Sequence, residues 1–226
     1  MNSVPKIELS VLGTFCFGSI LDVWFFPIYF LIMNSLISTI KSCRICEAYL
    51  PLGPRPVFVA DSAAKILIVG QAPGTKVHAS GIPWDDQSGK ELRRWLGVDK
   101  EEFYNPKLFA IVPMGFCYPG KGKGGDLPPR PECAPLWHHQ LLSQMPQIRL
   151  TLLIGSYSLE YYLGKSKKKN LTETITAFEE YLPAYFPLVH PSPRNKIWQK
   201  KNPWFEQVVV PRLREKVHAI IVNSNP

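Results

Sequence analysis

Alternating strand and helix patterns are the feature that most constrains the fold of this chain. Strands are predicted where short aliphatic runs stand, at residues 65–70, 108–113, 150–154 and 185–189. Helices are predicted at residues 89–96, 135–145, 156–163 and 171–181, and a last helix begins with Asn202 as N-cap and Pro203 in its first position. Strands separated by helical crossovers form parallel sheets with helices on both faces. The predicted fold is therefore α/β, a three-layer α/β/α sandwich with a small central parallel sheet of about four strands.

The N-terminal segment differs from the rest. Residues 11–33 are almost wholly apolar, and a segment of this length is about long enough to cross a bilayer, although Asp22 and Pro27 lie within it. No small-residue cleavage site marks it as a removed signal peptide. Residues 1–32 are interpreted as an apolar extension, either a membrane anchor or sequence from a start codon placed too early. The second interpretation is preferred, because residues 33–226 have the pattern of one complete domain.

The chain is basic, and its positive charge is unevenly distributed. The formal net charge is +8, and residues 165–216 contain eleven Lys or Arg against five Asp or Glu. A clustered basic surface attracts polyanions, most often phosphate backbones, although it can also serve solubility alone. The lysine-rich turn at 165–170 is a candidate phosphate contact only if it lies near the active face.

Four cysteines indicate a metal site. Cys43 and Cys46 form a CxxC pair before the first predicted strand, and Cys117 and Cys133 lie in and after a loop rich in glycine, proline and lysine. A reducing cytosol does not sustain disulfides, so a metal site is favoured for a protein of cytoplasmic character. Thiolates bind zinc and iron-sulfur clusters alike, and the spacing does not distinguish the two.

Two unusual motifs follow predicted strands, at the edge where parallel sheets bind ligands. Gly-Gln-Ala-Pro-Gly occupies residues 70–74 after the first strand. His-Pro-Ser-Pro-Arg-Asn occupies residues 190–195 after the last strand. Glycines let backbone amides approach a ligand closely, so residues 70–74 are expected to form a pocket floor.

These motifs and the cysteine order resemble the uracil-DNA glycosylase superfamily, particularly its iron-sulfur families 4 and 5. Residues 70–74 look like the first motif, GEAPG in family 4, and residues 190–195 look like the second motif, with a PRN ending closest to the single-strand-selective branch. The cysteine order also matches: a CxxC, a gap of about seventy residues, then two cysteines sixteen apart. The similarity runs from about Cys43 to Val217.

This resemblance implies a DNA repair glycosylase. Such an enzyme hydrolyses the N-glycosidic bond of a deaminated base, uracil first, and leaves an abasic site. It implies a 4Fe-4S cluster, with zinc as the alternative, and DNA as the partner. We expect a cytoplasmic, nucleoid-associated monomer with no obligate protein partner.

The resemblance also implies a role for each matching residue. His190 is expected to donate to a base oxygen where negative charge develops. Trp84 is expected to stack on the extruded base, or to be an ordinary core aromatic. The remaining assignments are base binding by Gly70, Ala72, Pro73 and Gly74, phosphate contact by Ser192, a wedge of Pro193 and Arg194, and cluster ligation by Cys43, Cys46, Cys117 and Cys133.

The carboxylate that activates water departs from the family pattern. Family 4 has glutamate where this chain has Gln71, and an amide orients a water but does not take its proton. Family 5 uses an aspartate in a D-x-S-G loop, and residues 86–89 match that loop. Asp86 is therefore predicted to be the base or the cation stabiliser, with Asp85 as the second choice. Helix N-capping is the other interpretation of both.

Base recognition departs as well. Family 4 has an asparagine four residues before its third cysteine, and here that position is Pro113, which has no side-chain donor or acceptor. Three alternatives remain open: a broader specificity for deaminated bases, a different lesion, and loss of catalysis. Asn195 is a candidate base reader or a cap of the turn. The alternative function is a non-catalytic iron-sulfur nucleic-acid-binding protein of the same fold. A zinc-stapled α/β protein acting on a free small molecule is a third hypothesis.

Overall fold

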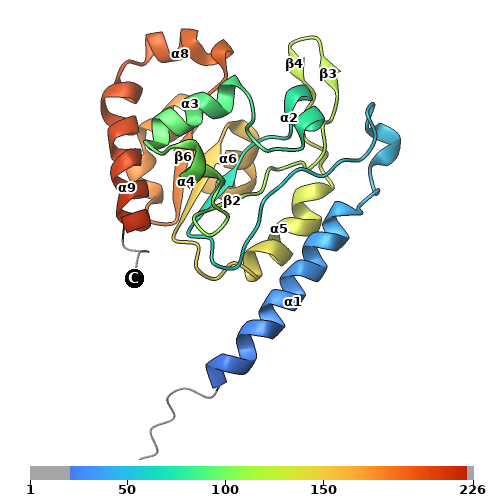
Figure 1. Cartoon of the computed structure of the whole chain (residues 1–226). Helices are drawn as coiled ribbons and strands as arrows, with labels where there is room; N and C mark the ends of the chain where they lie inside the picture. Colours follow the sequence, from blue (N-terminus) through green and yellow to red (C-terminus); the bar gives the residue numbers. More distant parts are fainter. Residues whose placement is uncertain (1–20, 223–226) are drawn as a thin grey trace, which may run out of the picture.

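The computed structural model describes the backbone of residues 21–222 and the side chains of residues 31–222. In this part of the chain a parallel sheet of four strands has the order β2-β1-β5-β6 (Figure 1). The strands are β1 (Ile66–Val69), β2 (Phe109–Ile111), β5 (Leu150–Ile154) and β6 (Tyr185–Leu188). All four lie within the predicted strands, so the small parallel sheet is confirmed.

Helices cover both faces of this sheet, as the three-layer prediction requires (Figure 1). The helices are α1 (Leu21–Lys41), α2 (Thr75–Ser80), α3 (Gln87–Leu96), α4 (Lys100–Tyr104), α5 (Cys133–Ser143), α6 (Ser156–Leu163), α7 (Leu171–Thr176), α8 (Lys196–Lys201) and α9 (Val210–Val222). Helices α3, α4, α7 and α9 pack on one face, and α1, α5 and α6 pack on the other.

Strand β1 shows why the sheet is buried on both faces. Ile66 and Ile68 belong to the core under α3 and α9, whereas Leu67 and Val69 belong to the core under α5 and α6. All four side chains have no exposed surface. Successive side chains of a strand point to opposite faces, so a continuous aliphatic run is the pattern of a central parallel strand.

Helix α1 runs past Met33 without a break. Met33 and Ile40 are buried in the core that includes α5. Residues 1–20, most of the predicted apolar extension, lie outside the described residues. Within the described residues no helix has the length and apolar character needed to cross a membrane. The domain boundary at residue 33 stays a prediction.

Two predicted helices differ from those observed. The segment 171–181 forms α7 and then a separate 3₁₀ turn, Phe178–Tyr181. Asn202 closes α8, because its side-chain amide donates to the carbonyl of Trp198 at 2.8 Å. The prediction that Asn202 is an N-cap was wrong. Helical structure resumes in a π turn, Phe205–Val209, which leads into α9.

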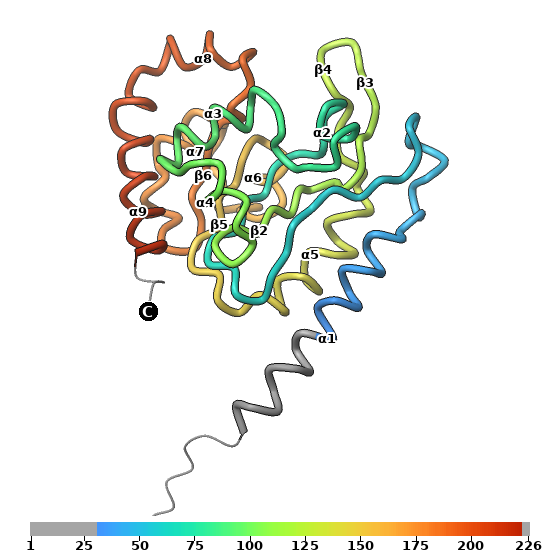
Figure 2. The backbone as a smooth tube through the Cα atoms, viewed as in Figure 1, coloured from blue at the N-terminus to red at the C-terminus, as the bar shows by residue number. Residues whose placement is uncertain are grey.

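The loop between Gly115 and Pro131 contains a small hairpin that the sequence analysis did not predict. Strands β3 (Lys121–Gly122) and β4 (Gly125–Asp126) pair antiparallel. The hairpin stands at the top of the molecule in Figure 1 and Figure 2, on the same side as α2 and α8.

The lysine-rich turn at 165–170 connects α6 to α7. Lys167 pairs with Glu160, and Lys168 pairs with Glu180. Two of the lysines are thus engaged by carboxylates, and a phosphate contact at this turn stays a prediction.

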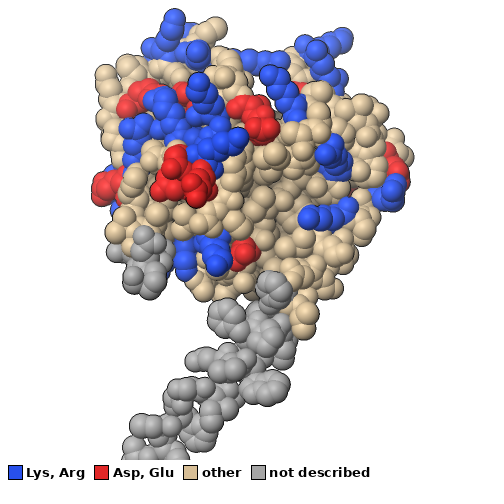
Figure 3. All heavy atoms as spheres, viewed as in Figure 1, with Lys and Arg blue, Asp and Glu red and all other residues tan. Residues whose placement is uncertain are grey.

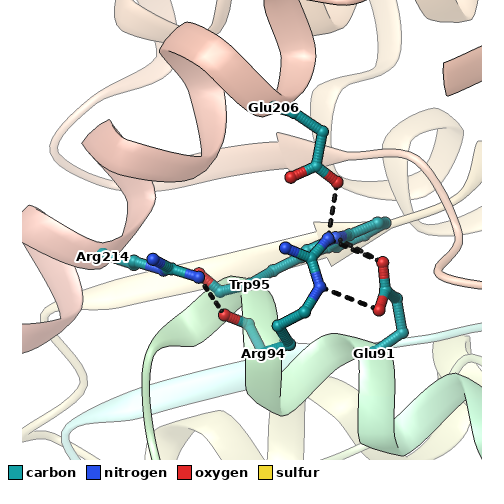
Figure 4. Close-up of polar contacts among 5 residues, drawn as sticks. All are labelled: Glu91, Arg94, Trp95, Glu206 and Arg214. Carbon is teal, nitrogen blue, oxygen red and sulfur yellow. Dashed lines mark hydrogen bonds and ion pairs between the residues drawn. The ribbon is translucent and has the colours of Figure 1, made fainter. Parts of the chain in front are cut away.

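A polar network fixes the end of α3 against α9 (Figure 4). Arg94 donates to both carboxylate oxygens of Glu91, at 3.0 and 2.8 Å, and to Glu206 at 2.6 Å. Arg214 donates to the carbonyls of Arg94 at 2.7 Å and Trp95 at 3.3 Å. The hydrogen bonds from Arg94 hold the pKa of Glu91 below its usual value. Since α3 begins at the candidate active site, this network helps to position that site.

Candidate active site

A pocket of about 460 Å³ lies beyond the carboxyl ends of the strands. The chain leaves β1 toward β2 on one side and leaves β5 toward β6 on the other, which makes this edge a topological switch point. The pocket brings together most of the residues predicted from the two motifs. Its lining includes Gly70, Gln71, Ala72, Pro73, Gly74, Trp84, Asp86, Pro113, His190, Ser192, Arg194 and Asn195.

Gly70 and Trp84 form one wall of this pocket. Gly70 directly follows β1 and is buried, and a Cβ there would lie 2.9 Å from Cζ2 of Trp84. Trp84 has a φ of 58°, a left-handed conformation that is rare for a bulky residue. Backbone strain of this kind gathers at functional sites. A side chain at residue 70 would displace the indole, so the glycine is needed for the close packing.

His190 lies against the same tryptophan. It stands two residues after β6, and its ring is stacked on that of Trp84 with centroids 5.5 Å apart. Burial lowers the pKa of His190, and the nearby charge of Asp86 opposes that shift. The imidazole is therefore neutral at pH 7, with one N–H to donate.

The Asp86 side chain both caps a helix and lines the pocket. Its carboxylate accepts a hydrogen bond from the Gly89 amide at 2.8 Å, which makes it the N-cap of α3. It also lines the pocket and acts electrostatically on His190. The capping interpretation of Asp86 is confirmed, and its place in the pocket leaves a chemical role available. Asp85, the second choice, is exposed and is not part of the pocket lining.

The amide side chains of the two motifs make hydrogen bonds within the protein. Gln71 donates from Nε2 to the carbonyl of Leu127 at 3.0 Å. Asn195 donates from Nδ2 to the carbonyl of His190 at 2.8 Å. Asn195 therefore closes the turn after β6, and in both side chains the amide oxygen remains as an acceptor.

The rest of the second motif forms a short turn at the pocket rim. Ser192 accepts a hydrogen bond from the Arg194 amide at 3.3 Å, and Pro193 begins a 3₁₀ turn that ends at Asn195. Pro193 and Arg194 are exposed. The Arg194 guanidinium donates to the Gly124 carbonyl at 2.8 Å, which joins this turn to the β3–β4 hairpin.

The backbone carbonyl of Pro113 is hydrogen-bonded to a buried histidine. His138 places Nε2 at 3.0 Å from the Pro113 carbonyl and Nδ1 at 2.7 Å from the Tyr162 hydroxyl. Since a carbonyl only accepts, Nε2 carries the proton and Nδ1 accepts from Tyr162. Burial lowers the pKa of His138 to about 4. The pocket wall at residue 113 is therefore an apolar ring whose carbonyl is already bonded.

Three of the four described cysteines are buried, and none forms a disulfide. Cys46 and Cys117 lie in one small apolar cluster with Leu50. Burial raises the pKa of Cys117 to about 12 and that of Cys133 to about 11, and in both cases the neighbouring cysteines add to the effect. Among the described side chains, no group of three or more His, Cys, Asp or Glu residues is arranged to hold a metal ion.

The sequence analysis missed several pocket residues. Pro83 lines it from the loop that carries Trp84, Ser88 lines it from the first turn of α3, and Gly124, Gly125 and Asp126 line it from the hairpin. The residues Gly122-Lys123-Gly124-Gly125 were a usable signal, because a two-residue connection containing glycine is typical of a β-hairpin.

The fold and this pocket define an α/β protein with a ligand site at the switch point of a parallel sheet. The sequence model of the Uracil DNA glycosylase superfamily matches residues 56–214. A protein of Saccharolobus solfataricus, named as a type-4 uracil-DNA glycosylase, is 24% identical over 174 residues, which are 71% of this chain and 76% of the relative. The chain belongs to the Uracil DNA glycosylase superfamily, and it is a DNA glycosylase, a hydrolase of N-glycosidic bonds that acts in DNA repair.

Proposed function

We propose that this enzyme removes a deaminated base, uracil first, from DNA and leaves an abasic site. The observation that carries this proposal is the stack of Trp84 on His190 beside Asp86, in one pocket at the carboxyl edge of the sheet. The similarity to a type-4 uracil-DNA glycosylase supports it. We further propose that the enzyme acts as a monomer on DNA in the cytoplasm.

The reaction needs stabilisation of charge on both sides of the bond that breaks. Water adds to C1′ of the deoxyribose, the C–N bond breaks, and its electron pair leaves with the base. Neutral His190 donates its N–H to a carbonyl oxygen of the base, where that negative charge gathers. Asp86 faces the positive sugar and takes the proton of the attacking water.

The same pocket accounts for entry of a base. A base inside a duplex is reached only after extrusion from the stack. Trp84 offers an aromatic face, and Gly70 to Gly74 supply backbone amides without Cβ atoms in the way. Pro193 and Arg194 are exposed at the rim, where they would fill the gap that the extruded base leaves.

We propose a specificity broader than uracil. Pro113 contributes an apolar surface where the related family has an asparagine side chain, so the pyrimidine edge meets no amide there. The amide oxygens of Gln71 and Asn195 remain as acceptors. Uracil, hypoxanthine and xanthine all carry a ring N–H beside a carbonyl, and an acceptor suits that shared feature.

The four thiols fit a 4Fe-4S cluster by their chemistry. Cys43, Cys46 and Cys133 each raise the pKa of Cys117, so the four thiols lie within electrostatic reach of one another. Cysteine thiolates are the ligands of such clusters, and a bound cationic group would offset the cost of ionising buried thiols. When bound, the cluster would brace the segments around 43–46 and 117–133. Zinc is the alternative occupant.

A gel assay tests the proposed activity. Fluorescent oligonucleotides carrying uracil, hypoxanthine or xanthine are incubated with the wild-type enzyme and then treated with alkali. Strand breakage at the uracil is expected, with weaker breakage at the purine lesions. If none of these bases is released while DNA is still bound, the protein is the non-catalytic binder instead. Anaerobic purification tests the cofactor, because a brown protein supports the cluster and a colourless zinc protein contradicts it.

A further inference from the structure

The β3–β4 hairpin is a part of the pocket rim to which the proposed function gives no role. The two strands of this hairpin are joined by only two residue pairs, and so short a hairpin is marginally stable by itself. Two hydrogen bonds from the motif loops hold it in place. Arg194 donates to the Gly124 carbonyl at 2.8 Å, and Gln71 donates to the Leu127 carbonyl, just after β4, at 3.0 Å. Its position is therefore coupled to the residues around the extruded base.

A glycine leaves room for Arg194 against the hairpin. Gly125 has a φ of +149°, and a Cβ at this residue would overlap Nη1 of Arg194 as it lies here. A larger residue at position 125 would therefore displace the guanidinium from its present contact with the hairpin.

Basic side chains lie on both sides of the pocket. Lys121 and Lys123 are exposed on the hairpin, and Lys200 and Lys201 are exposed on α8, which follows the second motif directly. None of the four forms an ion pair with another described residue. Figure 3 shows Lys and Arg atoms gathered in these two regions at the top of the molecule.

An extruded nucleotide stays attached to its strand at both ends. The backbone must therefore leave the pocket in two directions, and each direction brings phosphates toward the rim. Lysines that contact phosphates position a protein on DNA and supply most of its salt-dependent affinity. The hairpin and α8 stand where these two departing strands would run.

We propose that the hairpin is a DNA-binding arm: Lys121 and Lys123 bind phosphates on one side of the extruded nucleotide, and α8 binds those on the other side. This inference rests on the proposed function, because it takes the pocket as the place that receives the base.

Salt-dependent binding tests the arm. The probe is a duplex with a tetrahydrofuran abasic site, a stable mimic of the product, and affinity is measured by fluorescence anisotropy over a range of salt concentrations. For Lys121→Ala combined with Lys123→Ala, the slope of log K against log salt should become shallower by about 0.9 for each lysine. The matched control is Lys165→Ala combined with Lys169→Ala, two exposed lysines that do not line the pocket. An equal change in both double variants, or none in the hairpin variant, overturns the proposal.

Shortened DNA tests the assignment to opposite sides. Two single strands carry uracil near the 5′ end or near the 3′ end, so each keeps a flank on one side only. The hairpin double variant should lose affinity for one of these strands and bind the other as tightly as the wild type does. Lys200→Ala combined with Lys201→Ala should show the reverse preference. Weakening of both variants on the same strand contradicts the two-sided arrangement. Failure of the wild type to release uracil would instead count against the proposed function, since the binding measurements do not require cleavage.

Discussion

Replacing Asp86 with asparagine separates the two roles that this side chain can have. Asparagine caps a helix about as well as aspartate, so the bond from the Gly89 amide, 2.8 Å long in the wild type, can be kept. The charge, however, is lost. The free energy of unfolding should therefore change by only a few tenths of a kcal/mol. Alanine removes the cap as well and should cost about 1 kcal/mol.

The effect on catalysis should be much larger than the effect on stability. A positioned general base contributes about a hundredfold to ten-thousandfold in rate, which corresponds to about 3 to 5 kcal/mol of barrier. Single-turnover excision of uracil by Asp86→Asn should fall within this range, while Asp85→Asn, at an exposed residue outside the pocket lining, serves as the matched control. Loss of the Asp86 charge should also lower the pKa of His190 further, because that charge favours the protonated ring.

The assignment depends on the contrast between asparagine and alanine. If Asp86→Asn excises uracil at the wild-type rate, the carboxylate is only a cap, and another group must activate the water. If both variants lose activity and stability in the same proportion, the loss reflects displacement of α3 rather than missing chemistry.

Three other outcomes follow from the packing around the site. Burial keeps His138 neutral down to about pH 4, whereas the same histidine in the unfolded chain takes up a proton near pH 6.5. The free energy of unfolding should therefore decrease by up to about 3 kcal/mol as the pH falls from 6.5 to about 4. Chemical denaturation of His138→Gln should not show this pH-dependent decrease. Gly70→Ala should destabilise by about 1 to 3 kcal/mol and slow excision, because its Cβ would lie 2.9 Å from Trp84, whereas Gly124→Ala has open space and should keep the wild-type melting temperature. Cys117→Ser should remove the visible absorbance of the anaerobically purified protein, and unchanged absorbance would exclude this residue as a ligand.

The strands could be predicted because their burial leaves a plain pattern. Residues 66–69 are aliphatic and completely buried, which only a central strand or a buried helix allows, and the following Gly70 decides for the strand. The pocket residues could be predicted because parallel strands place their carboxyl ends at one edge. Gly70 and His190 could thus be expected in the same pocket, because each follows the carboxyl end of a strand in the same sheet.

Side-chain contacts between distant segments could not be predicted in this way. The hydrogen bond from Arg194 to Gly124 has no local pattern, because it joins residues far apart in sequence. The same holds for the hydrogen bonds that link His138 to Tyr162 and to Pro113. Asn202 shows the limit for local signals. Its side chain suits either end of a helix, and the preceding run 196–201 forms a helix that uses it as a donor.

The rate of uracil excision by His190→Ala, compared with the wild type, tests the central claim most directly. His190 should act as the hydrogen-bond donor to the leaving base, and loss of one such donor costs about a hundredfold to a thousandfold in rate. We expect that loss in single turnover, with affinity for the abasic-site duplex mostly retained. Excision at the wild-type rate, or a loss of DNA binding as large as the loss of rate, would contradict the account of this pocket.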